Sequence, residues 1–308
     1  MTRLVVLLML LSLSKGLSMG RQARYLATMT DASHGSLLKN VRALSFDVTG
    51  TLLIHRKPIM ETYADAAVWA KLPDPPSAAE LKPAFKKAYY ELLTESPCFA
   101  FGGNERDWWI KTVKRCLENC GRGDRYTDEE FQRFFRRVYQ HYGSLEGYEL
   151  LSDAVRFLEG VKKEGLFVEA MGICTNTPAR TVETVLPMNG LHDYFNWFVC
   201  CQDIGKEKPD KAIFDEFYKQ ALFWVPDLKR DEILHIGDNM ATDYCAARRA
   251  GFQGIVYIGS IGGIWGTYTF THTHTYIHTH TYSSSSRPKC QPSSDKLSRL
   301  DRGTRLSR

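Results

Sequence analysis

The hydrophobic pattern of the chain changes character near residue 165. Beyond it, short apolar runs of strand length alternate with segments whose apolar residues recur at helical spacing, over 178–189, 210–223 and 241–250. The apolar runs cover 166–174, 197–201, 233–236 and 254–258, and a similar run lies far upstream at 43–46. Strands that alternate with helices favour a parallel sheet covered by helices on both faces. The pattern therefore predicts an α/β fold with a five-stranded, doubly wound, Rossmann-like sheet.

The segment between the first two predicted strands is helical throughout. Its clearest stripe follows helical spacing and consists of Phe131, Phe134, Phe135, Val138, Tyr139 and Tyr142. We interpret such aromatic stripes as buried core. The domain prediction is a core made of 41–57 and 165–266, interrupted by an all-helical cap domain at 58–164.

The two ends of the chain differ from the middle in amino-acid composition, and each follows its own pattern. Residues 1–40 begin with a ten-residue apolar segment behind Arg3 and continue with basic and hydroxyl residues, a pattern typical of targeting segments. This favours a plastid or secretory route, or a cytoplasmic location if the segment is an inert extension. Residues 267–308 begin with Thr-His repeats, typical of a translated dinucleotide repeat, and are predicted to be a disordered low-complexity tail.

Charge and composition limit the partners. The net charge of +5 comes from the ends, because residues 41–266 hold 28 basic and 32 acidic residues. A basic surface for nucleic acid is therefore not expected in the folded part. With 44% hydrophobic residues but no apolar run of about 20, the chain is expected to be globular, without a stable membrane span in its mature form. The oligomeric state is left open.

The eight cysteines form no CxxC pair and have no histidines at zinc-site spacing. Cys116 and Cys120 lie one helical turn apart beside apolar residues. We therefore interpret them as small buried hydrophobic residues rather than metal ligands. This use of cysteine weakly favours a reducing compartment.

Polar residues follow several of the predicted strands. Ligands of such sheets bind at the carboxyl ends of the strands, so these residues are expected to converge. They are Asp47, Thr175, Asn176, Asp238 and Asp243, together with Lys208 before the helix at 210. Carboxylates of this kind bind Mg²⁺ or act as nucleophiles, while a hydroxyl and a lysine stabilise phosphoryl oxygens. The set predicts phosphoryl transfer.

Four motifs resemble those of the haloacid dehalogenase (HAD) superfamily, subfamily I, in which a helical cap lies between the first two motifs. Residues 47–52 (DVTGTL) match motif one except at Thr49, and Thr175 matches motif two. Lys208 in GKEKPD matches motif three, and Gly237-Asp238 with Asp243 matches motif four. Trp108-Trp109 and the GKEKPD segment resemble the REG-2-like group of that superfamily.

The resemblance implies a role for each residue. Asp47 would be the nucleophile, and Mg²⁺ would be held by Asp47, the backbone carbonyl of Thr49 and Asp238. The phosphoryl group of a small phosphorylated substrate would be bound by Thr175, Asn176 and Lys208. Asp243 would support Lys208 or the metal shell.

Thr49 departs from the family pattern, because phosphatases of the family carry an aspartate there as general acid and base. Three functions follow as alternatives: a Mg²⁺-dependent phosphohydrolase that works through a phospho-aspartate, a catalytically degenerate binding protein, or a phosphotransferase. Dehalogenases of the family lose the Gly-Asp of motif four, which stands intact here at Gly237-Asp238. Dehalogenation is therefore not expected.

Overall fold

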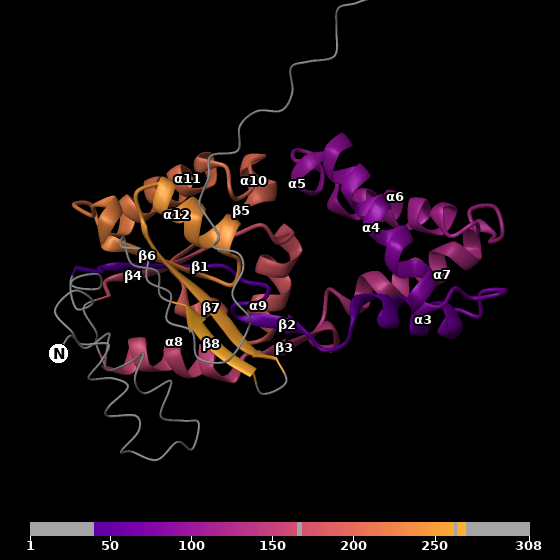
Figure 1. Ribbon diagram of the computed structural model, residues 1–308, viewed down its shortest axis with the longest axis horizontal. Helices are drawn as coiled ribbons and strands as arrows, with labels where there is room; N and C mark the ends of the chain where they lie inside the picture. Colours follow the sequence, from indigo (N-terminus) through magenta and orange to yellow (C-terminus); the bar gives the residue numbers. More distant parts are fainter. Residues whose placement is uncertain (1–39, 165–167, 262–263, 269–308) are drawn as a thin grey trace, which may run out of the picture.

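The computed structural model describes residues 40–164, 168–261 and 264–268. The predicted targeting segment and nearly all of the predicted tail lie outside these residues. The described chain forms an α/β core and a separate layer of helices, which are joined by two strands (Figure 1). Within the described part, no helix is both long and apolar enough to cross a bilayer.

A six-stranded sheet with the order β5-β4-β1-β6-β7-β8 forms the centre of the core. The first five are β1 (Ala43–Phe46), β4 (Ala170–Thr175), β5 (Trp197–Cys200), β6 (Ile233–Gly237) and β7 (Gln253–Ile261). Their mutual pairings are all parallel. The prediction of a five-stranded, doubly wound parallel sheet is therefore confirmed.

The sixth strand, β8 (Ile264–Tyr268), was not predicted. It pairs antiparallel with β7, in a register that shifts between Ile258 and Ile261. β8 extends two residues into the segment predicted as tail, because the outer edge of β7 offers backbone groups that a second strand can pair with whatever its side-chain pattern. The predicted disorder of the rest of the tail, 269–308, lies outside the described residues.

Helices cover both faces of the sheet. Successive residues of a strand point to opposite faces, so Ala43 packs in one buried cluster and Leu44 in another. The Ala43 side is covered by α10 (Cys201–Ile204), α11 (Lys211–Trp224) and α12 (Ala246–Arg249). The Leu44 side is covered by α8 (Ser152–Glu164), the π-helical turn η2 (Thr181–Val185) and α9 (Leu186–Met188). Shorter turns are η3 (His192–Tyr194), η4 (Arg230–Glu232) and the π-helical η5 (Met240–Cys245).

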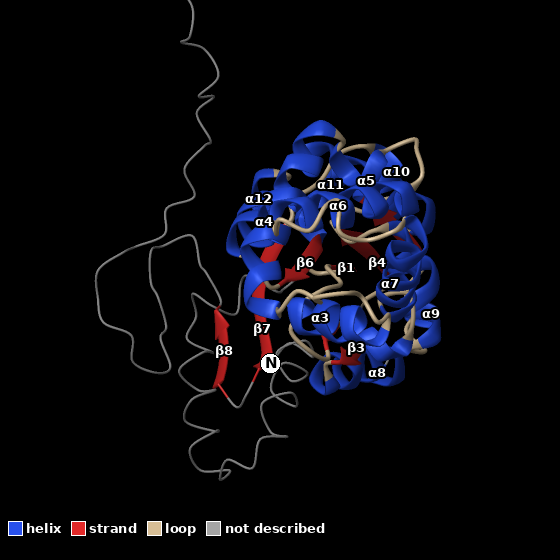
Figure 2. Cartoon of the chain, turned by 90° about the vertical axis from the view of Figure 1, so that its right-hand side faces the viewer, coloured by secondary structure: helices blue, strands red, loops and turns tan. Residues whose placement is uncertain are grey.

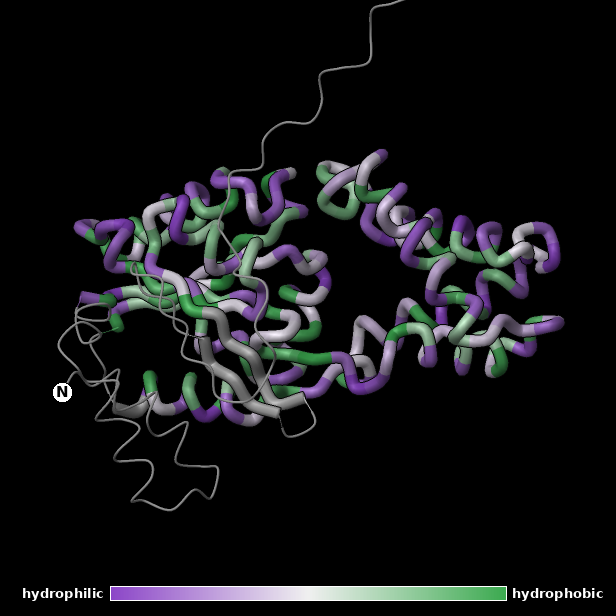
Figure 3. The backbone as a smooth tube through the Cα atoms, viewed as in Figure 1, coloured by the Kyte–Doolittle hydropathy of each residue, from purple (hydrophilic) through white to green (hydrophobic). Residues whose placement is uncertain are grey.

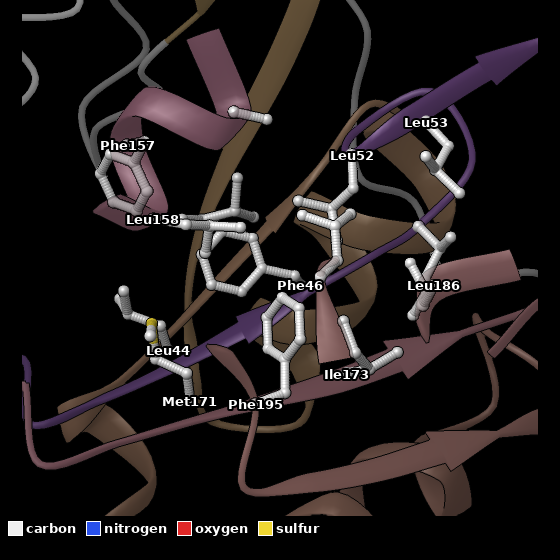
Figure 4. Packing of buried hydrophobic residues seen from close by; sticks show 14 of the residues in the cluster. Leu44, Phe46, Leu52, Leu53, Phe157, Leu158, Met171, Ile173, Leu186 and Phe195 are labelled. Carbon is white, nitrogen blue, oxygen red and sulfur yellow. The ribbon is translucent and has the colours of Figure 1, made fainter. Parts of the chain in front are cut away.

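Helix α8 corrects the predicted end of the cap. The predicted cap runs to residue 164 and includes 152–164, but Phe157 and Leu158 pack on the sheet against Leu44 and Phe46 (Figure 4). The rings of Phe46 and Phe157 lie 6.0 Å apart, edge to face. An amphipathic stripe shows that a helix has a buried face without showing which partner buries it. The cap therefore ends before β3.

The cap consists of α3 (Ile59–Trp69), α4 (Ala78–Glu95), α5 (Pro97–Ala100), α6 (Glu105–Asn119) and α7 (Asp128–His141). Hydrophobic and hydrophilic stretches alternate along its helices (Figure 3), as expected for amphipathic helices that pack on one another. Ser77 and Thr127 form capping boxes that begin α4 and α7. Strands β2 (Leu53–His55) and β3 (Tyr148–Leu150) pair antiparallel where the chain enters and leaves the cap (Figure 1). The turn η1 (Leu145–Gly147) precedes β3.

Candidate active site

Asp47 and Thr175 lie at the carboxyl ends of the two adjacent parallel strands β1 and β4. The Thr175 hydroxyl donates a hydrogen bond to Asp47 Oδ1 at 2.9 Å. Lys208 Nζ donates to the same oxygen at 2.8 Å. The other carboxylate oxygen of Asp47, Oδ2, accepts no hydrogen bond from any residue that the structure describes. One oxygen is thus fixed, and the other is free to react.

Lys208 is almost fully buried and lies between two carboxylates. Its Nζ is 2.8 Å from Asp47 Oδ1 and 2.5 Å from Asp243 Oδ1. Burial alone would lower the pKa of Lys208, but attraction by Asp47 and Asp243 outweighs it and raises that pKa. Lys208 is therefore a permanent positive charge beside Asp47, as its match to motif three predicts.

Asp243 is engaged through both of its oxygens. Oδ1 accepts from Lys208 and from His235, and Oδ2 accepts from the backbone N–H of Asn239 at 2.9 Å. Burial favours the neutral carboxyl, yet Lys208 and His235 outweigh it and lower the pKa of Asp243. Of the two predicted roles, support of Lys208 fits this arrangement better than a place in the metal shell.

His235 was missed by sequence reasoning. It is fully buried within β6, and its Nε2 lies 3.2 Å from Asp243 Oδ1 while its Nδ1 lies 2.8 Å from the Ser45 hydroxyl. Because an ionised carboxylate only accepts, Nε2 carries the proton and Nδ1 accepts from Ser45. Burial lowers the pKa of His235, so the ring is neutral. Its only sequence signal is a polar residue inside an otherwise apolar strand.

Replacing His235 with Leu is expected to lower the free energy of unfolding by about 1–3 kcal/mol, because it leaves the buried Ser45 hydroxyl without a partner. Urea denaturation of both proteins measures the change. Adding Ser45→Ala should restore part of the loss, since no buried hydroxyl then remains unpaired. Equal stability of wild type and His235→Leu would contradict this network.

Asn176 follows Thr175 at the carboxyl end of β4 and contacts the backbone of Lys208. Its side-chain amide donates to the backbone carbonyl of Lys208 at 2.8 Å, and its Oδ1 accepts from the Lys208 N–H at 2.7 Å. The prediction assigned Asn176 to phosphate binding; these two bonds use Oδ1 and only one of the two amide hydrogens, so that role stays a prediction. The amide therefore positions the loop that carries Lys208.

Asp238 lies at the end of β6, opposite Asp47. Carboxylate oxygens of Asp47, Asp238 and Asp243 lie within 4.8 Å of one another. Asp238 is exposed at the rim, yet surrounding protein partly desolvates its carboxylate, and this together with repulsion by Asp47 and Asp243 raises its pKa to about 6. Within the described chain, Asp238 forms no ion pair.

This donor set fits a hard divalent cation. Mg²⁺ prefers oxygen ligands, keeps several waters and usually takes one or two carboxylates from the protein. Asp47 Oδ2 and the Asp238 carboxylate, which forms no ion pair within the described chain, would supply those ligands, and a cation there would relieve their mutual repulsion. Gly50 allows the Asp238 carboxylate to lie close to the loop after β1, because a Cβ at position 50 would lie 2.2 Å from Asp238 Oδ2.

Comparison with known proteins agrees with this site. The family described as haloacid dehalogenase-like hydrolase matches residues 41–251, well over half of the chain. The chain belongs to the haloacid dehalogenase-like hydrolase family. The matched region holds every candidate site residue and the whole cap.

Relatives of known name support the predicted subgroup of these hydrolases. The chain is 28% identical over 223 residues to the Rhythmically expressed gene 2 protein of Drosophila melanogaster, covering 70% of this chain and 82% of that protein. It is 29% identical over 216 residues to Haloacid dehalogenase-like hydrolase domain-containing protein 3 of Danio rerio, covering 70% and 84%. The resemblance to the REG-2-like group is therefore confirmed.

Solved structures show the same fold. A 2-haloacid dehalogenase from Pseudomonas syringae is 23% identical, has a TM-score of 0.50, and covers 70% of this chain and 86% of its own. The Bacillus subtilis protein YfnB, bound to magnesium, is 21% identical, also has a TM-score of 0.50, and covers 71% and 89%. At this identity the likeness extends to the HAD fold alone.

Thr49 lies in the loop after β1, two residues beyond Asp47, and is half-buried. This loop is folded back, because the Gly50 N–H donates to the Leu53 carbonyl at 2.7 Å. Within the described residues, the Thr49 hydroxyl forms no hydrogen bond. The position at which family phosphatases carry aspartate thus holds a hydroxyl that has no hydrogen-bond partner among the described residues.

Replacing Gly50 with Ala is expected to weaken Mg²⁺ binding about tenfold or more, the size of effect seen when groups that orient metal ligands are lost. The added methyl would displace Asp238, and Gly50 also has a φ of +93°, which disfavours alanine. Calorimetric Mg²⁺ titration measures the loss. Gly121→Ala is the control, because Gly121 has a similar φ of +71° but nothing within 4 Å of its added Cβ. Equal affinities in the two variants would refute the steric argument.

Proposed function

We propose that this protein is a Mg²⁺-dependent phosphohydrolase that acts on a small phosphorylated metabolite through a phospho-aspartate at Asp47. The observation that carries the proposal is the asymmetry of the Asp47 carboxylate. Oδ1 is held by Thr175 and Lys208, whereas Oδ2 accepts no hydrogen bond within the described chain. A fixed carboxylate with one free oxygen beside a buried cation is suited to nucleophilic attack.

In the proposed reaction, Asp47 Oδ2 attacks the phosphorus of a phosphate monoester. The bond between phosphorus and the ester oxygen breaks, and that oxygen leaves with the bonding electrons and takes up a proton. Lys208 and Thr175 stabilise the charge on the phosphoryl oxygens. Water then attacks the phospho-aspartate, which releases inorganic phosphate and restores the carboxylate.

The metal would be held by Asp47, the Thr49 carbonyl and Asp238. When bound, Mg²⁺ neutralises the charge on the phosphate and on the attacking carboxylate. The intact Gly237-Asp238 pair supports phosphate chemistry over dehalogenation, since a carboxylate there serves a cation. The cap would close over the rim, exclude water and select the substrate.

A turnover assay with p-nitrophenyl phosphate tests the proposal. Wild type with Mg²⁺ should release phosphate, and both chelation of the metal and Asp47→Asn should abolish the release. Asp203→Asn is a matched control, because Asp203 is an exposed aspartate whose side chain contacts Cys200 and none of the candidate site residues. Turnover that survives in Asp47→Asn would refute the nucleophile.

The two alternatives give different outcomes in the same assay. A degenerate binding protein would bind phosphate without releasing p-nitrophenol. A phosphotransferase would release p-nitrophenol faster when an alcohol acceptor is added. The amount of inorganic phosphate released would then be smaller than the amount of p-nitrophenol.

A further inference from the structure

Three potential metal ligands meet where the cap touches the core, away from Asp47. Cys98 comes from α5 of the cap, Cys201 begins α10 of the core, and Glu207 precedes Lys208 in the connecting loop. Their ligand atoms, two sulfurs and a carboxylate oxygen, all lie within 4.8 Å of one another. Figures 1 and 2 both show α5 beside α10, although the two helices are far apart in the sequence.

The carboxylate of Glu207 has no compensating partner. It is half-buried, and no described residue donates a hydrogen bond to it or forms an ion pair with it. The lysines on either side of Glu207 pair elsewhere: Lys206 lies 3.6 Å from Asp210, and Lys208 contacts Asp47 and Asp243. Burial of a charge without a partner is unfavourable, so this position favours a bound cation.

The backbone around Cys98 is strained. Cys98, Phe99 and Ala100 all have positive φ values, of 53°, 55° and 64°. Three consecutive residues with side chains in this region cost roughly 1–2 kcal/mol each. Such strain persists where surrounding contacts enforce it, and it is common at ligand sites.

Aromatic contacts hold this turn in place. Phe99 packs edge to face on Trp108 at 5.1 Å and stacks on Trp109 at 5.8 Å. The indole N–H of Trp108 donates to the Ser96 carbonyl at 2.8 Å. The paired tryptophans therefore fix the turn that carries the Cys98 thiol into contact with the core.

We propose that Cys98, Cys201 and Glu207 bind a thiophilic divalent cation of the zinc class, which ties the cap to the core. Zinc takes thiolate and carboxylate ligands, and sites with three protein ligands keep water in the fourth position. Bond lengths of about 2.3 Å to sulfur and about 2.0–2.2 Å to oxygen require only a small inward movement of these side chains. Because Glu207 adjoins Lys208, the ion would also restrain the loop of the active site.

Binding displaces protons from both thiols. Thiolates rather than thiols bind a metal ion, so Cys98 and Cys201 must each lose a proton when the cation binds. Binding of the cation therefore releases about two protons, one from each thiol, to the buffer. Affinity for the ion should consequently increase with pH.

The geometry favours a cation over a disulfide. A disulfide would use both thiols and leave the Glu207 carboxylate still half-buried and unpartnered. A divalent cation engages all three groups and compensates that charge. Cys116 and Cys120 form a close pair within the cap, but among the described residues no carboxylate completes such a cluster with them.

Titration of the full-length, reduced protein with Co²⁺ tests the proposal. Cobalt bound to thiolate gives a near-ultraviolet charge-transfer band that imidazole or carboxylate ligands do not give. The histidines of the Thr-His tail and the carboxylates around Asp47 therefore do not interfere with this readout. Zn²⁺ should abolish the band by displacement, whereas Mg²⁺ should not.

The ligand variants are Cys98→Ala, Cys201→Ala and Glu207→Gln, with Cys116→Ala as the control for loss of a buried cap thiol. We expect either ligand thiol variant to lose the band or bind about 100-fold more weakly, since even orienting groups are worth 10–100-fold. Glu207→Gln should keep the band with weaker affinity. This half-buried position gives a variant that is expected to fold even if a cysteine variant does not.

Three results would overturn the proposal. One is the absence of a thiolate band in wild type. Another is a band that Cys116→Ala removes and Cys98→Ala does not. The third is a Cys98–Cys201 disulfide in protein purified without reductant that excludes the metal. Catalysis at Asp47 does not enter any of these readouts, so failure here leaves the proposed phosphohydrolase untouched.

Discussion

Replacement of Lys208 with Met is expected to lower the free energy of unfolding by about 3–5 kcal/mol and to abolish phosphoryl transfer. The ammonium group lies between Asp47 and Asp243, and its side chain is only 2% exposed. Met fills a similar volume but leaves two buried carboxylates facing each other without a cation. Urea denaturation measures the stability, and release of p-nitrophenol measures the activity.

Lys206 provides a matched control for this prediction. It is two residues away in the same GKEKPD segment, but it is exposed and its ion pair with Asp210 spans 3.6 Å. Exposed pairs contribute about 0–1 kcal/mol, so Lys206→Met should leave stability and turnover close to wild type. A similar loss in both variants would mean that the segment tolerates no substitution and that the buried charge is not the cause.

A double-variant comparison of stability tests the interaction between Lys208 and Asp243 directly. Asp243→Asn removes one of the two carboxylates that Lys208 contacts, so it should also destabilise. In the double variant Lys208→Met/Asp243→Asn, however, less negative charge remains unpaired. The double variant should therefore lose less than the sum of the single losses, by about 0.5–3 kcal/mol.

The sequence was sufficient to predict that the site residues lie close together, because residues at the carboxyl ends of parallel strands meet at one edge of the sheet. Asp47 and Thr175 follow adjacent strands, and the carboxyl ends of such strands share an edge. The packing of α8 was not predictable in the same way, because its stripe gives no information about its partner. His235 was hidden for a related reason: a lone polar residue in a strand reveals its role only through Ser45 and Asp243 on either side.

The cluster of Cys98, Cys201 and Glu207 could not be predicted from the spacing of residues in the sequence. Metal motifs are recognised when ligands lie close in sequence, as in CxxC. Here one ligand lies in the cap and two in the core, so only the packing of α5 on α10 brings them together. Spacing brings together only Cys116 and Cys120, which lie one helical turn apart.

Thr49→Asp is expected to raise turnover by about 10²–10⁴, the usual contribution of one general acid or base. This corresponds to roughly 3–5 kcal/mol at 1.36 kcal/mol per decade of rate. A threonine hydroxyl can hydrogen-bond the leaving oxygen but does not exchange a proton readily at neutral pH. The hydroxyl of Thr49 is half-buried and forms no hydrogen bond within the described residues. It lies two residues beyond Asp47, the proposed nucleophile, where a carboxylate would face the same space.

Two consequences follow in the wild type. Substrates with poor leaving groups, such as sugar phosphates, should react slowly, whereas acyl phosphates should react first because they need no proton. The phospho-aspartate should also persist, because no base at position 49 activates the water that hydrolyses it. Single-turnover kinetics with a labelled acyl phosphate separates the two steps, since label appears on the protein before it appears as free phosphate.

Thr49→Asn is the control that isolates proton transfer. Asparagine has nearly the shape of aspartate and can hydrogen-bond the leaving oxygen, but it does not act as an acid or base near neutral pH. Thr49→Asp should therefore shorten the life of the labelled protein, and Thr49→Asn should not. If wild type loses its label as fast as Thr49→Asp, another group supplies the base, and Thr49 then serves only through its backbone carbonyl.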